Sequence, residues 1–263
     1  MIKFCSLFSG SSGNCLFLNA GTTRVLIDAG ISAKRITEAL QSIGESPAGL
    51  SAILVSHEHS DHVRGIGVLS RKYNIPIYAN EATWNGMESE LGPVLAKNKM
   101  YFNTSREFEI GSVCIKAFPI PHDAAEPVGF NFFIDNKKIT TATDIGHINK
   151  ELLNCFLSSD LMLLESNHDI EMLKVGRYPW FLKQRILGDR GHLSNEMAGK
   201  VVAYMAENGT KKFMLGHLSK ENNFPELAFQ TVYNILSEKN IKVGEDISVD
   251  VVLRDRVGKV VEL

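Results

Sequence analysis

An apolar run leads straight into a histidine-rich loop in Ala52-Ile53-Leu54-Val55-Ser56-His57-Glu58-His59-Ser60-Asp61-His62. The apolar run predicts a buried strand, and the polar residues begin where that strand ends. Side chains two positions apart in an extended chain point the same way, so His57 and His59 can bind one cation. Asp61 and His62 lie where the chain turns into a helix and can reach a second cation. Because this spacing is rare by chance, we interpret the loop as a site for two metal ions rather than as an ordinary polar surface loop.

The composition is that of a globular protein. The chain has 263 residues, of which 44% are hydrophobic, and we expect a single domain over residues 1–263. The formal net charge of −2 creates no global field for nucleic acid or anionic membranes, so any basic surface must be local. No apolar run approaches the roughly 20 residues of a membrane span, and no signal peptide is recognised. The sequence therefore predicts a cytoplasmic protein with no membrane partner.

Strand and helix patterns alternate at both ends of the chain, and a β-rich stretch separates them. Two back-to-back sheets with helices outside both would bury the apolar faces of all these elements. We expect strands at 3–8, 15–19, 24–28, 52–56, 75–79, 113–118, 129–134, 138–143, 161–165 and 213–215, and helices at 33–43, 62–72, 81–91, 150–157, 180–187, 195–207 and 225–239.

A site for two metals needs more donors than one loop can supply. His122, Asp144 and His217 each sit at the end of a predicted strand, as His57 does. Taken alone, each would more often be a surface or capping residue, because loops are normally polar. Beside the histidine-rich loop, we interpret all three as further ligands.

With Asp28 in Leu-Ile-Asp-Ala-Gly, this ordered set resembles the five motifs of the metallo-β-lactamase-fold hydrolases, and the match covers essentially the whole chain. The resemblance implies an α/β fold, a four-layer αβ/βα sandwich of two mixed β-sheets flanked by helices. It implies that Asp28 orients the histidine-rich loop through hydrogen bonds. An Asp rather than a Cys at the bridging position disfavours a true β-lactamase. The implied ligands are His57, His59 and His122 for the first metal, Asp61, His62 and His217 for the second, and Asp144 as the bridge between them.

A closer resemblance is to the YycJ/WalJ group, which is related to the ribonuclease Z and PhnP phosphodiesterases. That group is implied to contain DNA 5′-to-3′ exonucleases linked to mismatch repair. The resemblance therefore implies a metal-dependent phosphodiesterase with two divalent ions, Zn²⁺ or Mn²⁺, a bridging hydroxide as nucleophile, DNA as substrate and repair proteins as partners. It rests on the segments 8–14, 165–169, 178–187, 190–194 and 216–223.

Two residues are candidates for catalysis itself. Asp61 can orient the attacking hydroxide while it acts as a ligand. His192 belongs to neither metal set and can give a proton to the leaving oxygen; in ribonuclease Z-like enzymes a histidine in a comparable context is implied to serve this purpose. The alternative is that His192 caps the helix beginning near Ser194. His168 is expected to support a ligand or to cap a helix beside Asp169.

One basic and aromatic segment is a candidate for binding nucleic acid. Residues 171–190 hold five cations and two carboxylates, net +3, in a chain of net charge −2. Cations on phosphates and aromatic rings under bases hold single strands without reading sequence. The alternative is an amphipathic helix whose aromatic rings are core. The expected substrate contacts are Arg177, Tyr178, Trp180, Lys183 and Arg185, with Asn14 in the Ser/Gly-rich turn 9–14.

Three other functions remain open. A cyclic phosphodiesterase, or a thioester or lactone hydrolase, could use the same metals on a small molecule. A thioester or lactone hydrolase would not need the basic aromatic segment. A metal-bearing scaffold that binds DNA without catalysis is the third alternative, and the complete ligand set argues against it.

Overall fold

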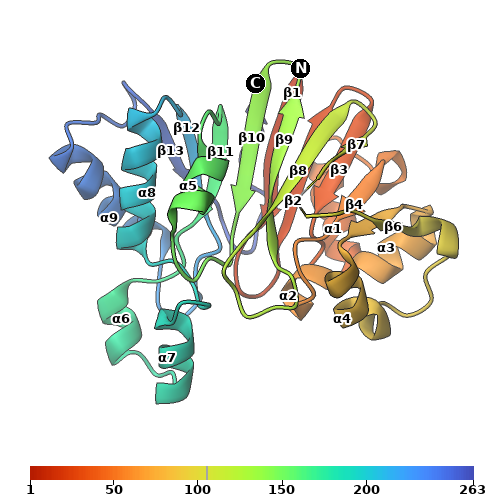
Figure 1. Cartoon of the computed structure of the whole chain (residues 1–263), viewed down its shortest axis with the longest axis horizontal. Coiled ribbons are helices and arrows are strands. Elements are labelled where there is room, and N and C mark those ends of the chain that lie inside the picture. Colours follow the sequence, from red (N-terminus) through yellow and green to blue (C-terminus); the bar gives the residue numbers. More distant parts are fainter. Residues whose placement is uncertain (105) are drawn as a thin grey trace.

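Two β-sheets lie back to back, and helices cover the outer face of each sheet in the computed structural model (Figure 1). The structure describes residues 1–104 and 106–263, and within these each sheet has seven strands. This arrangement confirms the predicted αβ/βα sandwich. Among the described residues, no helix is long and apolar enough to span a bilayer.

The first sheet has the strand order β14-β1-β2-β3-β4-β5-β6. Its strands from β14 to β3 pair antiparallel, whereas β3 to β6 run parallel, with helices as the connections. The strands are β1 (Ile2–Phe8), β2 (Cys15–Ala20), β3 (Thr23–Ile27), β4 (Ala52–Leu54), β5 (Ile77–Ala79), β6 (Lys99–Tyr101) and β14 (Val261–Glu262), and the helices of this half are α1 (Ala33–Ser42), α2 (Ser60–Val63), α3 (Ile66–Tyr73), α4 (Glu81–Leu91) and the short 3-10 turns Pro47–Gly49 and Ala96–Asn98.

The second sheet has the order β13-β12-β11-β10-β9-β8-β7, with β10 to β13 parallel. Helices α6 and α7 project beyond the sandwich at the lower edge of Figure 1, apart from the helices that cover the sheet. The elements are β7 (Glu107–Ile110), β8 (Val113–Pro119), β9 (Val128–Ile134), β10 (Lys137–Ala142), β11 (Leu161–Glu165), β12 (Lys212–Gly216), β13 (Ser248–Val251), α5 (Lys150–Phe156), α6 (Ile170–Val175), α7 (Trp180–Leu187), α8 (Asn195–Glu207) and α9 (Pro225–Glu238).

Both faces of each sheet are buried, which explains the continuous apolar runs in the central strands. In β11, Leu161 and Leu163 pack between the sheets, whereas Met162 and Leu164 pack under α5, α8 and α9. This alternation follows from the two-residue period of an extended chain. The sandwich is therefore held by three apolar layers, and its rigid strand ends can position polar side chains at one edge.

The structure differs from the predicted elements mainly where they are short. The helix expected over 62–72 is two helices, α2 and α3, because the Gly65 amide donates to the Ala29 carbonyl oxygen at 2.8 Å instead of continuing α2. The sequence did not predict β6, β7, β13, β14 or α6. These elements have two to six residues, too few to display a period.

Gly30 provides a test of how tightly the histidine-rich loop is held. A Cβ at Gly30 would lie 1.5 Å from the Asp61 carbonyl oxygen, which also accepts a hydrogen bond from the Asn14 amide at 2.8 Å. We expect Gly30→Ala to force these segments apart and to lower the free energy of unfolding in urea by about 1–3 kcal/mol. Gly49→Ala is the control, because its nearest contact is 3.5 Å from a flexible arginine side chain. Equal stability of the two variants would contradict the prediction.

Candidate metal centre

The structure brings all seven predicted ligands together at one edge of the sandwich. His57 and His59 follow β4, His122 follows β8, and Asp144 and His217 follow β10 and β12. The two predicted sets appear as separate groups, each with its ligand atoms within 4.8 Å of one another: His57, His59 and His122 in one, and Asp61, His62 and His217 in the other.

The Asp144 carboxylate lies between these two groups. Its Oδ2 is 3.4 Å from His62 Nε2, and its Oδ1 is 3.5 Å from His217 Nε2 and 3.8 Å from His122 Nε2. In the first group, His57 Nε2 lies 3.1 Å from His59 Nδ1. The donor atoms of both groups thus converge on a shared carboxylate, which is the arrangement that the resemblance implied.

The donors fit divalent metal ions. Asp144 Oδ2 and His217 Nε2 are buried and have no hydrogen-bond partner in the part of the chain that the structure describes. Unpaired buried polar atoms are costly, and a cation would satisfy both. Burial, helped by the charge of His62, holds the pKa of His57 well below its usual range, so this imidazole is neutral and able to bind a metal.

At His62, a proton competes with a metal ion for the imidazole. Although burial opposes the charge, the carboxylates of Asp28 and Asp144 raise the pKa of His62 to about 9. Metal binding must therefore displace a proton from this imidazole at neutral pH. Affinity for metal should consequently fall as the pH is lowered.

The backbone turns sharply where three site residues leave their strands. Asp28, Asp144 and His217 have φ values of 60°, 61° and 57°, in the left-handed region. Residues other than glycine rarely adopt this conformation, and such strain is often found at functional sites. Here the conformation directs each side chain from the end of a strand into the cluster.

Asp28 makes the contacts expected of an orienting residue. Its Oδ1 accepts from the Ser56 amide at 2.8 Å, and its Oδ2 accepts from Ser56 Oγ and lies 2.8 Å from His62 Nδ1. A carboxylate on Nδ1 leaves Nε2 of the imidazole available to a metal and raises its basicity.

Glu165 is a site residue that our sequence reasoning missed. This fully buried carboxylate lies at the end of β11, with Oε1 2.7 Å from His217 Nδ1 and 2.9 Å from His192 Nδ1. Its Oε2 accepts from the amides of Ile145 and Leu193 at 2.7 and 3.0 Å. Burial favours the neutral acid, yet the nearby His192 and His217 hold the pKa of Glu165 well below its usual range. An acidic residue ending an apolar strand, as Asp28 does, was the signal available in the sequence.

His192 lies at the mouth of the cluster and does not cap a helix. Ser194 caps α8, since its Oγ accepts from the Met197 amide at 3.2 Å, so the capping alternative for His192 is wrong. Burial opposes protonation of His192, but the Glu165 carboxylate raises its pKa above the ordinary value. A protonated imidazole beside the ligands can give a proton to a leaving oxygen.

His168 also differs from its expected roles. The cap of α6 is Asp169, whose Oδ1 accepts from the Met172 amide at 2.8 Å. Both ring nitrogens of His168 are buried and lack a hydrogen-bond partner among the described residues. Within the part of the chain that the structure describes, the His168 ring therefore supports no ligand through a hydrogen bond.

Two predicted substrate contacts do not fit their positions. Asn14 is 4% exposed; its Oδ1 accepts from the Gly10 amide at 2.9 Å, and its Nδ2 is 3.0 Å from His62 Nε2, so it belongs to the framework of the cluster. Lys183 is buried in α7, and its ammonium donates to the Lys174 carbonyl oxygen at 2.6 Å. Neither side chain is available to a phosphate.

The other predicted contacts lie at or beyond the mouth of the cluster. Tyr178 and Arg185 line a cavity of about 150 Å³ together with His192, and Arg185 forms an ion pair with Asp123. Arg177 is exposed just before α7. Trp180 and the neighbouring Phe181 are 67% and 71% exposed, so the alternative in which these rings are core is wrong.

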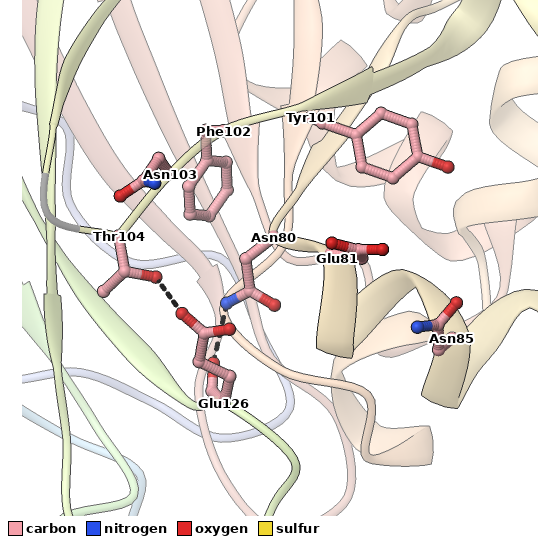
Figure 2. Close-up of a pocket in the computed structure, with 8 residues that line it drawn as sticks. All are labelled: Asn80, Glu81, Asn85, Tyr101, Phe102, Asn103, Thr104 and Glu126. Carbon is pink, nitrogen blue, oxygen red and sulfur yellow. Dashed lines mark hydrogen bonds between the residues drawn. The ribbon is translucent and has the colours of Figure 1, made fainter.

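A larger cavity of about 660 Å³ lies beside α4 and contains none of the predicted ligands (Figure 2). It is lined by amides and by the carboxylates of Glu81 and Glu126, without Lys, Arg or His, so it does not attract phosphate. Asn80 Nδ2 donates to the Glu126 carbonyl oxygen at 2.8 Å, and Thr104 Oγ1 donates to its carboxylate. These two hydrogen bonds tie the segment that follows His122 to Asn80 and Thr104.

Comparisons with known proteins place the chain in a family. Residues 23–218 match the beta-lactamase superfamily domain, and the chain belongs to this family of metallo-β-lactamase fold. It is 44% identical over 249 residues to the exodeoxyribonuclease WalJ of Streptococcus pneumoniae (strain D39), covering 94% of this chain and 93% of that protein. It is 43% identical to the exodeoxyribonuclease YycJ of Bacillus anthracis, covering 93% and 92%. The predicted resemblance and the prediction of a metal-dependent hydrolase are thereby confirmed.

The fold is also that of a solved structure. The metallo-β-lactamase fold protein YhfI from Bacillus subtilis superposes with a TM-score of 0.73 over 98% of this chain and all of that one, at 15% identity. At this identity the likeness concerns the fold alone.

Glu165→Gln tests the orienting role of the carboxylate. The amide keeps the size of the side chain but removes the charge shared by His192 and His217, so we expect affinity for Zn²⁺ to fall about 10- to 100-fold by calorimetry. Asp160→Asn, at the opposite end of β11, removes a carboxylate that pairs with Lys137 at 2.8 Å and should leave zinc affinity unchanged. Unaltered affinity in Glu165→Gln would show that the carboxylate only fills space.

Proposed function

We propose that this protein is a DNA 5′-to-3′ exonuclease that uses two divalent metal ions and acts in DNA repair. The observation that carries the proposal is the convergence of two complete donor groups on Asp144. It is supported by the identity of 44% over nearly the whole chain with a protein named exodeoxyribonuclease.

The ligand set suits two ions with a preference for nitrogen and oxygen donors, Zn²⁺ or Mn²⁺. When bound, such ions make water acidic enough to act as a nucleophile at neutral pH and neutralise charge on a phosphodiester. The proposed ligands are His57, His59 and His122 for one ion, and Asp61, His62 and His217 for the other, with Asp144 shared.

The leaving oxygen requires a proton, which we assign to His192. Its Nδ1 is held by Glu165 Oε1 at 2.9 Å, which fixes the ring and leaves Nε2 as the atom that can donate. Burial opposes the charge, but the Glu165 carboxylate raises the pKa of His192 above its ordinary value and so favours the protonated imidazole. Glu165 thus positions both a ligand, His217, and the proton donor.

Nucleic acid would be held on two flanks of the cluster. On one flank are Arg177 and the exposed Trp180 near the start of α7. On the other flank, just past His217, a cavity of about 300 Å³ is lined by Lys220, Arg254 and Arg256 beside Phe224, which is 47% exposed. The lining holds these three cations and one carboxylate, Asp255, so its formal charge is +2 and attracts phosphates. The cations provide the phosphate contacts that the buried Lys183 cannot.

The first test is substrate class. Loaded with Mn²⁺ or Zn²⁺, the protein should release mononucleotides from the 5′ end of DNA, and a chelator should stop the reaction. Asp144→Asn should lower the rate more than about 100-fold, because it removes the shared ligand rather than an outer partner. A protein that leaves DNA intact but hydrolyses a cyclic phosphodiester or a thioester would overturn the proposal.

The salt dependence of DNA binding provides the matching control. The logarithm of the binding constant for single-stranded DNA should fall linearly with the logarithm of the salt concentration. Replacing Arg254 and Arg256 by Ala should make this slope shallower by about 0.7 for each phosphate that the protein no longer neutralises. Lys239→Ala, at the far end of α9, should not change the slope. An unchanged slope in the double variant would exclude the basic cavity as a site of phosphate binding.

The second test concerns the proton donor. His192→Ala should slow hydrolysis of a natural phosphodiester by about 10²–10⁴-fold with the metal content unchanged. A nitrophenyl ester should be affected far less, because nitrophenolate leaves without a proton. Equal losses on both substrates would contradict the assignment, as would a loss of metal.

A further inference from the structure

A separate cavity next to His192 has no part in the steps described above. Its volume is about 260 Å³, and four segments line it: the loop after β10, the loop after β11, the end of α7 and the start of α8. Its apolar walls include Ile148, Ile170, Leu187 and Met197. Leu187 and Met197 are 44% and 38% exposed, so an apolar rim opens to solvent.

One buried polar side chain in this cavity lacks a partner. His168 is 1% exposed and lines the cavity, and neither ring nitrogen has a hydrogen-bond partner among the described residues. The backbone of His168 is fixed in place. The Asn195 amide donates to the His168 carbonyl oxygen at 2.9 Å, and His168 forms an isolated parallel β-bridge with Ser194. An unpartnered buried imidazole in a fixed position calls for an explanation, and a ligand provides one.

The charge state of His168 limits what that ligand can be. Burial lowers its pKa to about 4, so the ring is neutral at neutral pH and offers one donor and one acceptor. A neutral imidazole suits a polar, uncharged partner and gives little attraction to a phosphate. The apolar walls likewise suit the faces of a flat ring.

The position of the cavity relates it to the proposed reaction. His192 lines this cavity and also the one that contains Tyr178 and Arg185 at the mouth of the cluster. Gly146, two residues after Asp144, is part of its wall. A group seated here would therefore adjoin the bond under attack.

We infer that this cavity binds the nucleobase of a nucleotide next to the scissile phosphodiester, with His168 contacting the polar edge of the base. The inference rests on the proposed nuclease function. Enzymes that act on nucleotides often hold a base between apolar side chains and hydrogen-bond its edge. This contact increases the affinity for DNA. A single imidazole can distinguish few bases, so it provides little sequence selectivity.

The first experiment compares 5′-phosphorylated DNA strands that are intact or carry an abasic residue at the terminal or the adjacent position. We expect the wild-type protein to lose about tenfold or more in kcat/KM on one of the two abasic strands. In Met197→Trp the indole fills the rim of the cavity and excludes the base. Relative to the wild type, kcat/KM of this variant should fall by a similar factor on the intact strand and should hardly change on the abasic strand that the wild type cleaves poorly. Tyr204→Trp, also exposed on α8 but outside the cavity, should behave as the wild type. Equal cleavage of all three strands by an active wild-type protein would overturn the inference while leaving the nuclease function intact.

The second experiment does not depend on turnover. Calorimetry on the metal-loaded protein should show deoxyadenosine 5′-monophosphate binding about tenfold or more tighter than deoxyribose 5-phosphate. His168→Leu should remove most of this difference, and His168→Gln, which keeps a donor and an acceptor, should restore part of it. If the protein digests no DNA, the proposed function is wrong. The binding measurement still shows whether the cavity holds a nucleobase. Equal affinities for the two compounds, or a difference unaffected by His168→Leu and Met197→Trp, would refute it.

Discussion

A buried carboxylate surrounded by imidazoles is the constraint on which the rest of the site depends. Burial opposes ionisation of Asp144, yet the neighbouring His217 and His62 hold its pKa below the usual range. A charge in this position is tolerated only if several donors converge on it, and they do so from separate strand ends. The close spacing that stabilises the Asp144 charge also places its carboxylate within reach of the donor atoms of both groups.

The two sheets support this cluster in the same way. In the first sheet, Asp28 follows β3 and holds Nδ1 of His62; in the second, Glu165 ends β11 and holds Nδ1 of His217. Each carboxylate also accepts a backbone amide, so it is fixed independently of the histidine. Asp144 and His217 lie just after strand ends, and Asp61 and His62 lie in α2, so packed elements rather than free loops set the positions of these ligands.

Local pattern predicted much of this molecule. Strand periodicity and the end of each apolar run located β4, β8 and β10, and with them His57, His122 and Asp144. Helices α4, α7 and α8 agree with their predicted bounds to the residue, because clear signals flank them: Asn80, Pro179 and Ser194 precede them, and Gly92, Gly188 and Asn208 follow. The two-residue strand β14 gave no such signal, since its place depends on pairing with β1.

The sequence by itself determined most of the longer elements, the family and a set of seven candidate donor residues, because these follow from periodicity and from motifs within short segments. Only the tertiary structure decided which polar side chains reach the cluster and which do not. Lys183 turns inward because α6 presents a carbonyl oxygen to it. Asn14 lies beside His62 because backbone hydrogen bonds join its segment to Gly30 and Asp61. Glu165 and His168 gained their surroundings from segments distant in the chain. Their environments are long-range properties, which no local pattern of residues encodes.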